Sequence, residues 1–387
     1  MGEIKMKYIQ PLNIIHKNGI NEIGNSLISA RRAIENENHQ LQLSPQQILR
    51  LVLLGCLSIE IQQSSGANYS FDFEEGQTFT ALRNYIKTQI DDNWIQEYLY
   101  LSEFEMSSIK YDSAFQFLKS NLGSSLFSHL LPYALELLEY SEQDLAKAST
   151  DRRFGIVTHK KKTNGIYYTP ADVASYMTET CVNKLSKKHN SLFCCRFMDF
   201  SCGSGIFLLQ IIDSVFQRLK INSFEDYVSY ISSSLFGMDI SKYAVDCARY
   251  TVLSHSIRKF QNQKVNIKSL LKVLEQNIVS ADATKLLEYF ECHPDYPQRF
   301  DCIIGNPPYV GVITESKNGA QQSSRSNLFI PFVSNLVDYS TDNSICALVI
   351  PLSFSYNNQP SYRDMRRMIQ KDSAEWYIEH YDRSPDS

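Results

Sequence analysis

The sequence predicts an α/β fold, in which a mostly parallel β-sheet is covered by helices on both faces, preceded by an all-helical region. In residues 1–150 the apolar positions recur at helical spacing, which is typical of buried or amphipathic helices. From residue 166 onward, short apolar runs alternate with helix-like segments, an order that favours parallel strands joined by helices. We therefore expect a helical domain over 1–150, a linker over 151–165 and an α/β domain over 166–387.

The helical domain is expected to contain two strongly apolar helices. Ser44 followed by Pro45 is a favoured helix start, and apolar positions continue at helical spacing from Ile48 to Ile59. A second apolar stripe covers residues 126–138. Residues 64–76, rich in small and polar residues, indicate a loop between them.

Six apolar runs in the second domain are expected as strands, with helices at 171–188, 205–219 and 242–256 between several of them. The strands are 197–200, 235–239, 277–280, 300–305, 347–350 and 376–380. Ligands in such folds bind at the carboxyl ends of the strands.

The first candidate site follows the first strand, where the chain reads Asp199-Phe-Ser-Cys-Gly-Ser-Gly205. Gly203 and Gly205 permit a tight turn and a close approach of a ligand to the backbone. The helix N-terminus that follows favours an anionic group such as a carboxylate. Alone, this turn is equally compatible with an ordinary strand-to-helix connection.

One acidic residue ends the second strand, and another follows the third. Asp239 can accept two hydrogen bonds from a ribose diol, although it can also cap the helix that follows Ser241. Asp282 can accept a hydrogen bond from the amino group of a cofactor's adenine, or it can cap a turn. Together with the glycine turn, these acids favour a nucleoside-containing ligand.

The most specific motif is Asn306-Pro307-Pro308-Tyr309, which follows the strand FDCIIG. Two prolines force the backbone out of the sheet. We expect the Asn306 side-chain oxygen and the Pro307 carbonyl oxygen to accept both N–H bonds of an exocyclic amino group. Tyr309 offers a flat face on which a base can stack. The alternative is a rigid turn that leaves a strand.

These motifs together resemble the amino-methyltransferases that act on DNA adenine, in the gamma permutation. Gly165-Ile-Tyr-Tyr-Thr-Pro170 is similar to the upstream motif of that class, and it separates the DNA enzymes from relatives that methylate glutamine in release factors. The resemblance covers roughly residues 150–387. A helical region before it is similar to modification subunits of type I systems and to fused type II restriction–modification enzymes.

The resemblance implies a Rossmann-like, class I S-adenosylmethionine-dependent methyltransferase fold, with S-adenosylmethionine as cofactor and no metal. The residues that would hold the cofactor are Tyr168, Thr169 and Pro170 beside its methionine end, Asp199, Gly203 and Gly205 on the methionine moiety, Asp239 on the ribose and Asp282 on the adenine. Phe329 would lie near the cofactor or the target base. The target adenine would be flipped out of the DNA. Phe200-Ser201 departs mildly from the Pro-Ala that is usual in the first motif.

Composition limits the other functions that the chain can have. The formal net charge of −4 means that DNA binding would depend on local patches. Two basic segments, residues 151–165 and the trio Arg363, Arg366 and Arg367, are either solvated or in contact with phosphates. The nine cysteines contain no C-x-x-C pair, which favours free thiols in a reducing cytoplasm.

Neither a membrane-spanning segment nor a nuclease activity is expected. The longest apolar stretch, Ile48 to Ile61, is too short and too polar to cross a membrane. In residues 1–150 the acid-x-lysine pattern of a nuclease occurs only as Glu3-Ile4-Lys5, with no room upstream for a partner acid.

The C-terminal part of the sequence raises an expectation about partners. The sheet of the resembled class ends with a hairpin whose last strand inserts between the fifth and sixth strands, and no such strand follows residues 376–380. We therefore expect a truncated or split methyltransferase, served by a specificity subunit or a second polypeptide, within a restriction–modification or phage-defence system. The alternatives are methylation of RNA or of a protein glutamine, and a non-catalytic subunit that holds cofactor or DNA.

Overall fold

The computed structural model describes residues 4–6, 14–64, 77–90, 92–121, 127–138, 169–261, 263, 265–309, 311–314, 324–371 and 378–380. The basic segment 151–165 and Tyr168 lie outside these residues.

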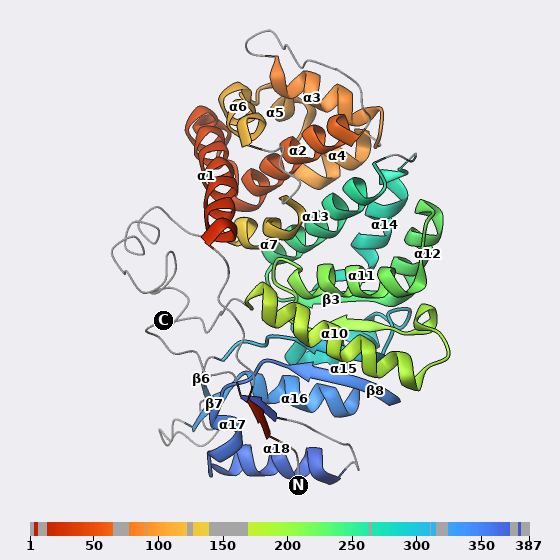
Figure 1. The fold of residues 1–387 in the computed structure, drawn as a ribbon. Helices are drawn as coiled ribbons and strands as arrows, with labels where there is room; N and C mark the ends of the chain where they lie inside the picture. The colour runs from red at the N-terminus through yellow and green to blue at the C-terminus, as the bar shows by residue number, and fades with distance from the viewer. Residues whose placement is uncertain are drawn as a thin grey trace.

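The N-terminal region is helical, as predicted, apart from the short strand β1 (Ile4–Met6). Its helices are α1 (Ile14–Glu37), a 3-10 turn (His39–Leu41), α2 (Pro45–Ser64), α3 (Thr78–Lys87), α4 (Asp92–Leu99), α5 (Glu103–Ser107), α6 (Asp112–Asn121) and α7 (Phe127–Leu137). Figure 1 shows them gathered above the sheet. The start of α2 agrees with the prediction, and Gln47 adds a capping box by accepting hydrogen bonds from the amide and hydroxyl of Ser44, both at 2.8 Å.

Helix α2 is the centre of this region. Every residue from Ile48 to Ile61 is buried, because α2 packs against α1 and α6 on the N-terminal side and against α13 (Lys242–Lys259) on the other. Gly55 permits the close packing, since a Cβ atom there would lie 2.2 Å from the Tyr111 hydroxyl oxygen. That hydroxyl donates a hydrogen bond of 2.6 Å to the Leu51 carbonyl oxygen.

The second region contains a five-stranded parallel sheet in the order β4-β3-β2-β5-β8. The strands are β2 (Phe197–Asp199), β3 (Leu235–Asp239), β4 (Ile278–Ser280), β5 (Phe300–Gly305) and β8 (Ser340–Leu348). The connecting helices are α10 (Ala171–Lys188), α11 (Ile206–Leu219), α12 (Phe224–Ser234), α13, α14 (Ile267–Asn277), α15 (Leu286–Cys292) and α16 (Phe329–Asp338). Two shorter helices, α17 (Ser353–Tyr356) and α18 (Pro360–Lys371), follow β8.

Helices cover both faces of the sheet, as the alternation of strands and helices predicts. Phe197 of β2 points into the core beneath α10, α11 and α13, whereas Met198 points into a second core beneath α15 and α16. This alternation follows from the two-residue period of a strand. The predicted α/β fold class is therefore confirmed.

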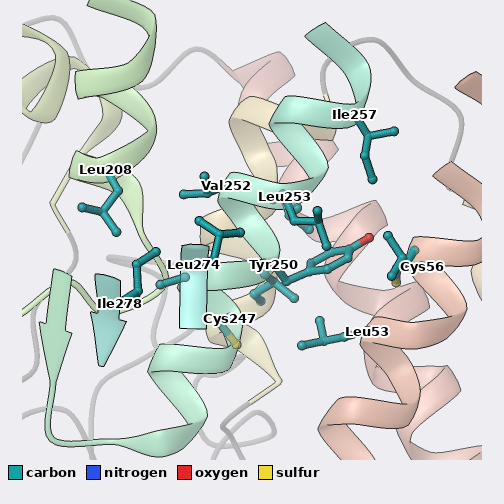
Figure 2. Packing of buried hydrophobic residues seen from close by; sticks show 14 of the residues in the cluster. Leu53, Cys56, Leu208, Cys247, Tyr250, Val252, Leu253, Ile257, Leu274 and Ile278 are labelled. Carbon is teal, nitrogen blue, oxygen red and sulfur yellow. The ribbon is translucent and has the colours of Figure 1, made fainter. Parts of the chain in front are cut away.

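The larger core continues without a break into the N-terminal helices. Figure 2 shows Leu53 and Cys56 of α2 facing the Tyr250 ring and Leu253 of α13. A buried ion pair joins the same two helices, with 2.5 Å between Arg50 Nε and Asp246 Oδ2. The N-terminal helices are thus packed against the sheet region through α13, and the boundaries of the two domains stay a prediction.

Two strand predictions need correction. The expected strand at 347–350 overlaps only the last two residues of a longer strand, β8, which runs from Ser340 to Leu348. The apolar pattern misses residues 340–344 because polar residues are tolerated on this partly exposed strand at the edge of the sheet. The expected sixth strand exists as β9 (Ile378–His380), but it pairs in parallel with β1, Ile4 opposite Ile378, instead of joining the sheet.

A short antiparallel hairpin, β6 (Gly311–Thr314) with β7 (Ser324–Asn327), was not expected. It follows the Asn-Pro-Pro-Tyr segment in the chain. No described helix is both long enough and apolar enough to cross a bilayer.

Candidate cofactor and base-binding site

The carboxyl ends of β2 and β3 bring the glycine loop and Asp239 into contact. Gly203 N donates a hydrogen bond of 3.0 Å to Asp239 Oδ2, and Cys202 N donates one of 2.9 Å to the Met238 carbonyl oxygen. Gly203 and Gly205 have φ values of 52° and 92°, a region that residues with a Cβ atom adopt rarely. The local reason for glycine at both positions is therefore the backbone conformation of the loop.

Asp239 supports this loop without capping the next helix. Its Oδ1 accepts a hydrogen bond of 2.9 Å from Ser241 N, whereas the N-cap of α13 is Ser241 itself, whose hydroxyl accepts from Ala244 N. Burial raises the pKa of Asp239, and the backbone N–H groups of Ser241 and Gly203 counteract that rise. The capping alternative that the sequence left open is thus assigned to Ser241.

Asp199 is the most unusual carboxylate of the site. Its side chain is fully buried, and its Oδ1 accepts a hydrogen bond of 2.9 Å from Ser201 N. Oδ2 has no hydrogen-bond partner among the described residues. Burial raises the pKa of Asp199 to about 8. A buried oxygen without a donor is costly, so this position is suited to a ligand that carries N–H groups.

Gly305 brings the glycine loop next to the Asn-Pro-Pro-Tyr segment. A Cβ atom on Gly305 would lie 2.7 Å from Asp199 Oδ1, so only glycine allows the ends of β2 and β5 to approach this closely. Residues 306–309 then leave the sheet, as the two prolines predict.

Asn306 and Tyr309 contact each other. The Tyr309 hydroxyl lies 2.5 Å from Asn306 Oδ1 and 2.9 Å from the Val349 carbonyl oxygen. Its ring meets the ring of Phe329 edge-on, with 6.5 Å between centroids. Phe329 is fully buried at the start of α16, so in this structure it packs against the Tyr309 ring.

Asp282, Thr169 and Pro170 are the remaining candidate residues that the structure describes. Asp282 follows β4 and caps the 3-10 turn Ala283–Lys285, where its Oδ1 accepts from Thr284 N at 2.9 Å. This is the capping role that the sequence left open, and its contact with an adenine stays a prediction. Thr169 is buried, and Pro170 is the N-cap of α10.

Sequence reasoning missed two residues at this site. Ile240 follows Asp239 directly and is 73% exposed, so it offers an apolar surface beside the expected ribose position. Glu136 of α7 accepts a hydrogen bond of 2.8 Å from the Ser204 hydroxyl in the glycine loop. The signal for Ile240 is its position after the acid, but no local signal indicates Glu136 because 68 residues separate it from Ser204.

The three arginines of α18 do not form one surface. Arg366 donates hydrogen bonds to the carbonyl oxygens of Phe354, at 2.6 Å, and Asn357, at 2.8 Å. Arg367 lies 3.5 Å from Asp364, and Arg363 is exposed. Arg366 therefore holds the backbone around α17, a role that neither the solvated nor the phosphate-contacting alternative included.

The chain was compared with known proteins. Residues 233–384 match the family model of the Eco57I restriction-modification methylases, and no curated protein matches the chain significantly. The chain is similar to a modification subunit of a putative type I restriction enzyme from Vibrio vulnificus YJ016, with 16% identity and a TM-score of 0.51, covering 93% of this chain and 76% of that one.

Two further solved structures are similar. The methyltransferase subunit of a type I restriction-modification system from Streptococcus thermophilus has 13% identity and a TM-score of 0.50, covering 92% of this chain and 79% of that one. The type IIL restriction-modification enzyme MmeI, in complex with DNA, has 14% identity and a TM-score of 0.51, covering 94% and 53%. The fold is shared with these proteins, and the family match confirms the resemblance to restriction-modification methylases over residues 233–384.

Proposed function

We propose that this chain is an S-adenosylmethionine-dependent DNA methyltransferase that modifies the exocyclic amino group of adenine within a restriction-modification or phage-defence system. The observation that carries the proposal is the apposition of Gly305 and Asp199, which puts the Asn306–Tyr309 segment beside the glycine loop. A methyl donor in that loop and an amino group at Asn306 would then share one edge of the sheet. The match of residues 233–384 to restriction-modification methylases supports this reading.

The residues present fit the cofactor. Asp199 Oδ2 is buried without a donor among the described residues, which suits the ammonium group of a methionine moiety. Among the described residues, a Cβ atom on Gly203 would meet only Glu136 Oε1, at 3.9 Å, so none of them crowds the loop at this position. Asp239 and the exposed Ile240 would receive the ribose and an apolar face of the adenine. When bound, S-adenosylmethionine supplies an electrophilic methyl group.

Asn306 and Pro307 would activate the target nitrogen. The Asn306 side-chain oxygen and the Pro307 carbonyl oxygen are acceptors, and an exocyclic amino group offers two donors. Accepting both N–H bonds draws the nitrogen lone pair away from the aromatic ring, which makes the nitrogen nucleophilic. Orientation and hydrogen bonding would then supply most of the catalysis.

The Tyr309 hydroxyl has a second acceptor within reach, so it can leave Asn306 Oδ1 to the amino group. A phenol carries one proton and donates to one acceptor at a time, and in this structure both Asn306 Oδ1 and the Val349 carbonyl oxygen lie within its reach. An entering amino group that takes Asn306 Oδ1 leaves the hydroxyl to donate to Val349. The ring remains available for stacking on the base, which is worth about 1–3 kcal/mol.

The proposal is tested with the Asn306→Ala variant. Wild-type chain, with any partner it needs, should place a labelled methyl group on DNA that digestion and mass spectrometry identify as N6-methyladenine. Asn306→Ala should lose this product by a factor of about 100 or more, because its interaction strengthens in the transition state, while calorimetry shows unchanged binding of S-adenosylmethionine. Label that appears in RNA or in a protein glutamine, and not in DNA, would assign the alternative substrate.

A further inference from the structure

Helix α7 of the N-terminal region contacts both segments that flank the proposed cofactor site. The buried Tyr133 hydroxyl donates a hydrogen bond of 3.0 Å to the Thr169 carbonyl oxygen, in the segment that leads into α10. One turn further along α7, Glu136 Oε1 accepts a hydrogen bond of 2.8 Å from the Ser204 hydroxyl. One helix outside the sheet region thus holds the residue before Pro170 and the middle of the glycine loop.

Ser204 is held from two sides. Its side chain is bound to Glu136, and its carbonyl oxygen accepts a hydrogen bond of 2.8 Å from the Thr251 hydroxyl of α13. Gly205 leaves no room for adjustment, because a Cβ atom there would lie 3.1 Å from Ala248 Cα. The glycine loop is therefore clamped between α13 on one side and α7 on the other.

The surroundings of Tyr133 keep its hydroxyl a donor. Burial raises the pKa of Tyr133 well above its ordinary value, and the carboxylates of Glu136 and Asp172 raise it further. The hydroxyl therefore stays protonated at all physiological pH values and can hold the Thr169 carbonyl oxygen throughout.

We propose that Glu136 and Tyr133 are positioning residues, through which the N-terminal helical region holds the cofactor site in its binding conformation. The inference rests on the proposed function and deepens it, because it assigns to that region a part in cofactor binding. Bound cofactor should in turn stabilise α7. If a partner protein shifts the helical region, the factor by which it changes the affinity for the cofactor should equal the factor by which the cofactor changes the affinity for that partner.

The test is calorimetric titration of S-adenosylmethionine into the full chain. Glu136→Ala and Ser204→Ala should each weaken binding about tenfold, the loss expected for one hydrogen bond to a charged group. The double variant should lose little more than either single one, since both remove the same contact. Glu136→Gln should retain most of the affinity, because its amide oxygen still accepts from Ser204.

The matched control is Glu105→Ala in α5. Glu105 also accepts a hydrogen bond from a serine hydroxyl, that of Ser102, but on an exposed helix cap away from the glycine loop. It should leave the dissociation constant unchanged. In turnover assays with any partner that the chain needs, Glu136→Ala should raise the KM for the cofactor and leave kcat at saturation nearly unchanged, a split that general destabilisation does not produce.

Three outcomes would overturn the inference. Wild-type affinity in Glu136→Ala, with the cofactor still bound, would remove α7 from the site and leave the proposed function intact. An equal loss in Glu136→Gln and Glu136→Ala would mean that the charge acts directly on the cofactor, not through Ser204. Absence of cofactor binding by the wild-type chain would refute the proposed cofactor and this inference with it.

Discussion

At the scale of single residues, burial changes the protonation of the Asp199 carboxyl group. Its carboxylate is buried, its Oδ2 has no donor among the described residues, and its pKa is raised to about 8. A carboxylic acid that is neutral at pH 7 must ionise to pair with an ammonium group. Cofactor binding should therefore release a proton.

The same shift predicts how stability depends on pH. The folded chain binds the Asp199 proton more tightly than the unfolded chain, whose pKa is near 3.8. The cofactor-free chain should therefore lose stability as pH rises from about 4 to about 8. Asp199→Asn should remove this dependence and raise the free energy of unfolding at pH 8 by about 1–3 kcal/mol.

Chemical denaturation at pH 6 and pH 8 measures this effect, with Asp295→Asn as the control at an exposed position. The assignment fails if Asp199→Asn retains the pH dependence of the wild type. The variant should also bind S-adenosylmethionine more weakly, because a neutral amide cannot pair with an ammonium group.

Two variants of Tyr309 distinguish the stacking role of its ring from the hydrogen-bonding role of its hydroxyl. Tyr309→Phe keeps the ring on Phe329 and removes the hydroxyl that lies 2.5 Å from Asn306 Oδ1. It should retain stacking and much of the activity, whereas Tyr309→Ala should weaken base binding by about 1–3 kcal/mol. Methylation rates and DNA affinity of the two variants check this, and equal losses in both would show that stacking is not the main role of the ring.

At the scale of elements, α2 joins the helical region to α13 through tight packing. A Cβ atom at Gly55 would lie 2.2 Å from the Tyr111 hydroxyl oxygen and 2.6 Å from Leu118 Cδ1. Overpacking a buried contact of this kind costs about 1–3 kcal/mol. Gly55→Ala should lower the free energy of unfolding by that amount.

The double variant Gly55→Ala with Tyr111→Phe tests whether the clash with the Tyr111 hydroxyl causes the loss of stability. Removal of the hydroxyl relieves the nearest clash, so the double variant should be destabilised by less than the sum of the two single variants. Denaturant titrations of all four proteins complete the cycle. Strict additivity would mean that the backbone moves away from Tyr111 and that the close approach is not essential.

At the scale of the whole molecule, the edge of the sheet bears on how the proposed enzyme would recognise a DNA sequence. Among the described strands, β8 pairs with β5 on one side only, and strand edges of this kind can accept a further strand. The sequence predicts a specificity subunit or second polypeptide for this purpose, and that partner stays a prediction.

A reconstitution assay addresses the partner. The purified chain alone should bind S-adenosylmethionine but should methylate a defined DNA site weakly or not at all, and a partner that supplies recognition should restore the rate. The salt dependence of DNA binding should also become steeper with the partner, because more phosphates are neutralised. Full-rate, site-specific methylation by the chain alone would contradict the expectation.

The sequence by itself determined the features that depend on local order. The alternation of strands and helices, the glycine turn after β2, the acid that ends β3, the acid after β4 and the prolines after β5 are all visible in short windows. Parallel strands share a carboxyl edge, so this order already implies that Asp199, Asp239 and Asn306 meet. The helices of the N-terminal region could also be predicted locally, because apolar residues recur there at helical spacing.

Only the tertiary structure decided the contacts between distant segments. Glu136 reaches Ser204 across 68 residues, and the Tyr309 hydroxyl reaches Val349 across 40. Strand β9 has a partner at the other end of the chain, in β1. A hydrogen bond between distant residues depends on how helices and strands are arranged in three dimensions. A strand of three residues is too short for its sequence pattern to predict the strand with which it pairs. The motifs of the candidate site are therefore visible in the sequence, and their chemistry stays a prediction, whereas the distant residues that hold the glycine loop are visible only in the structure.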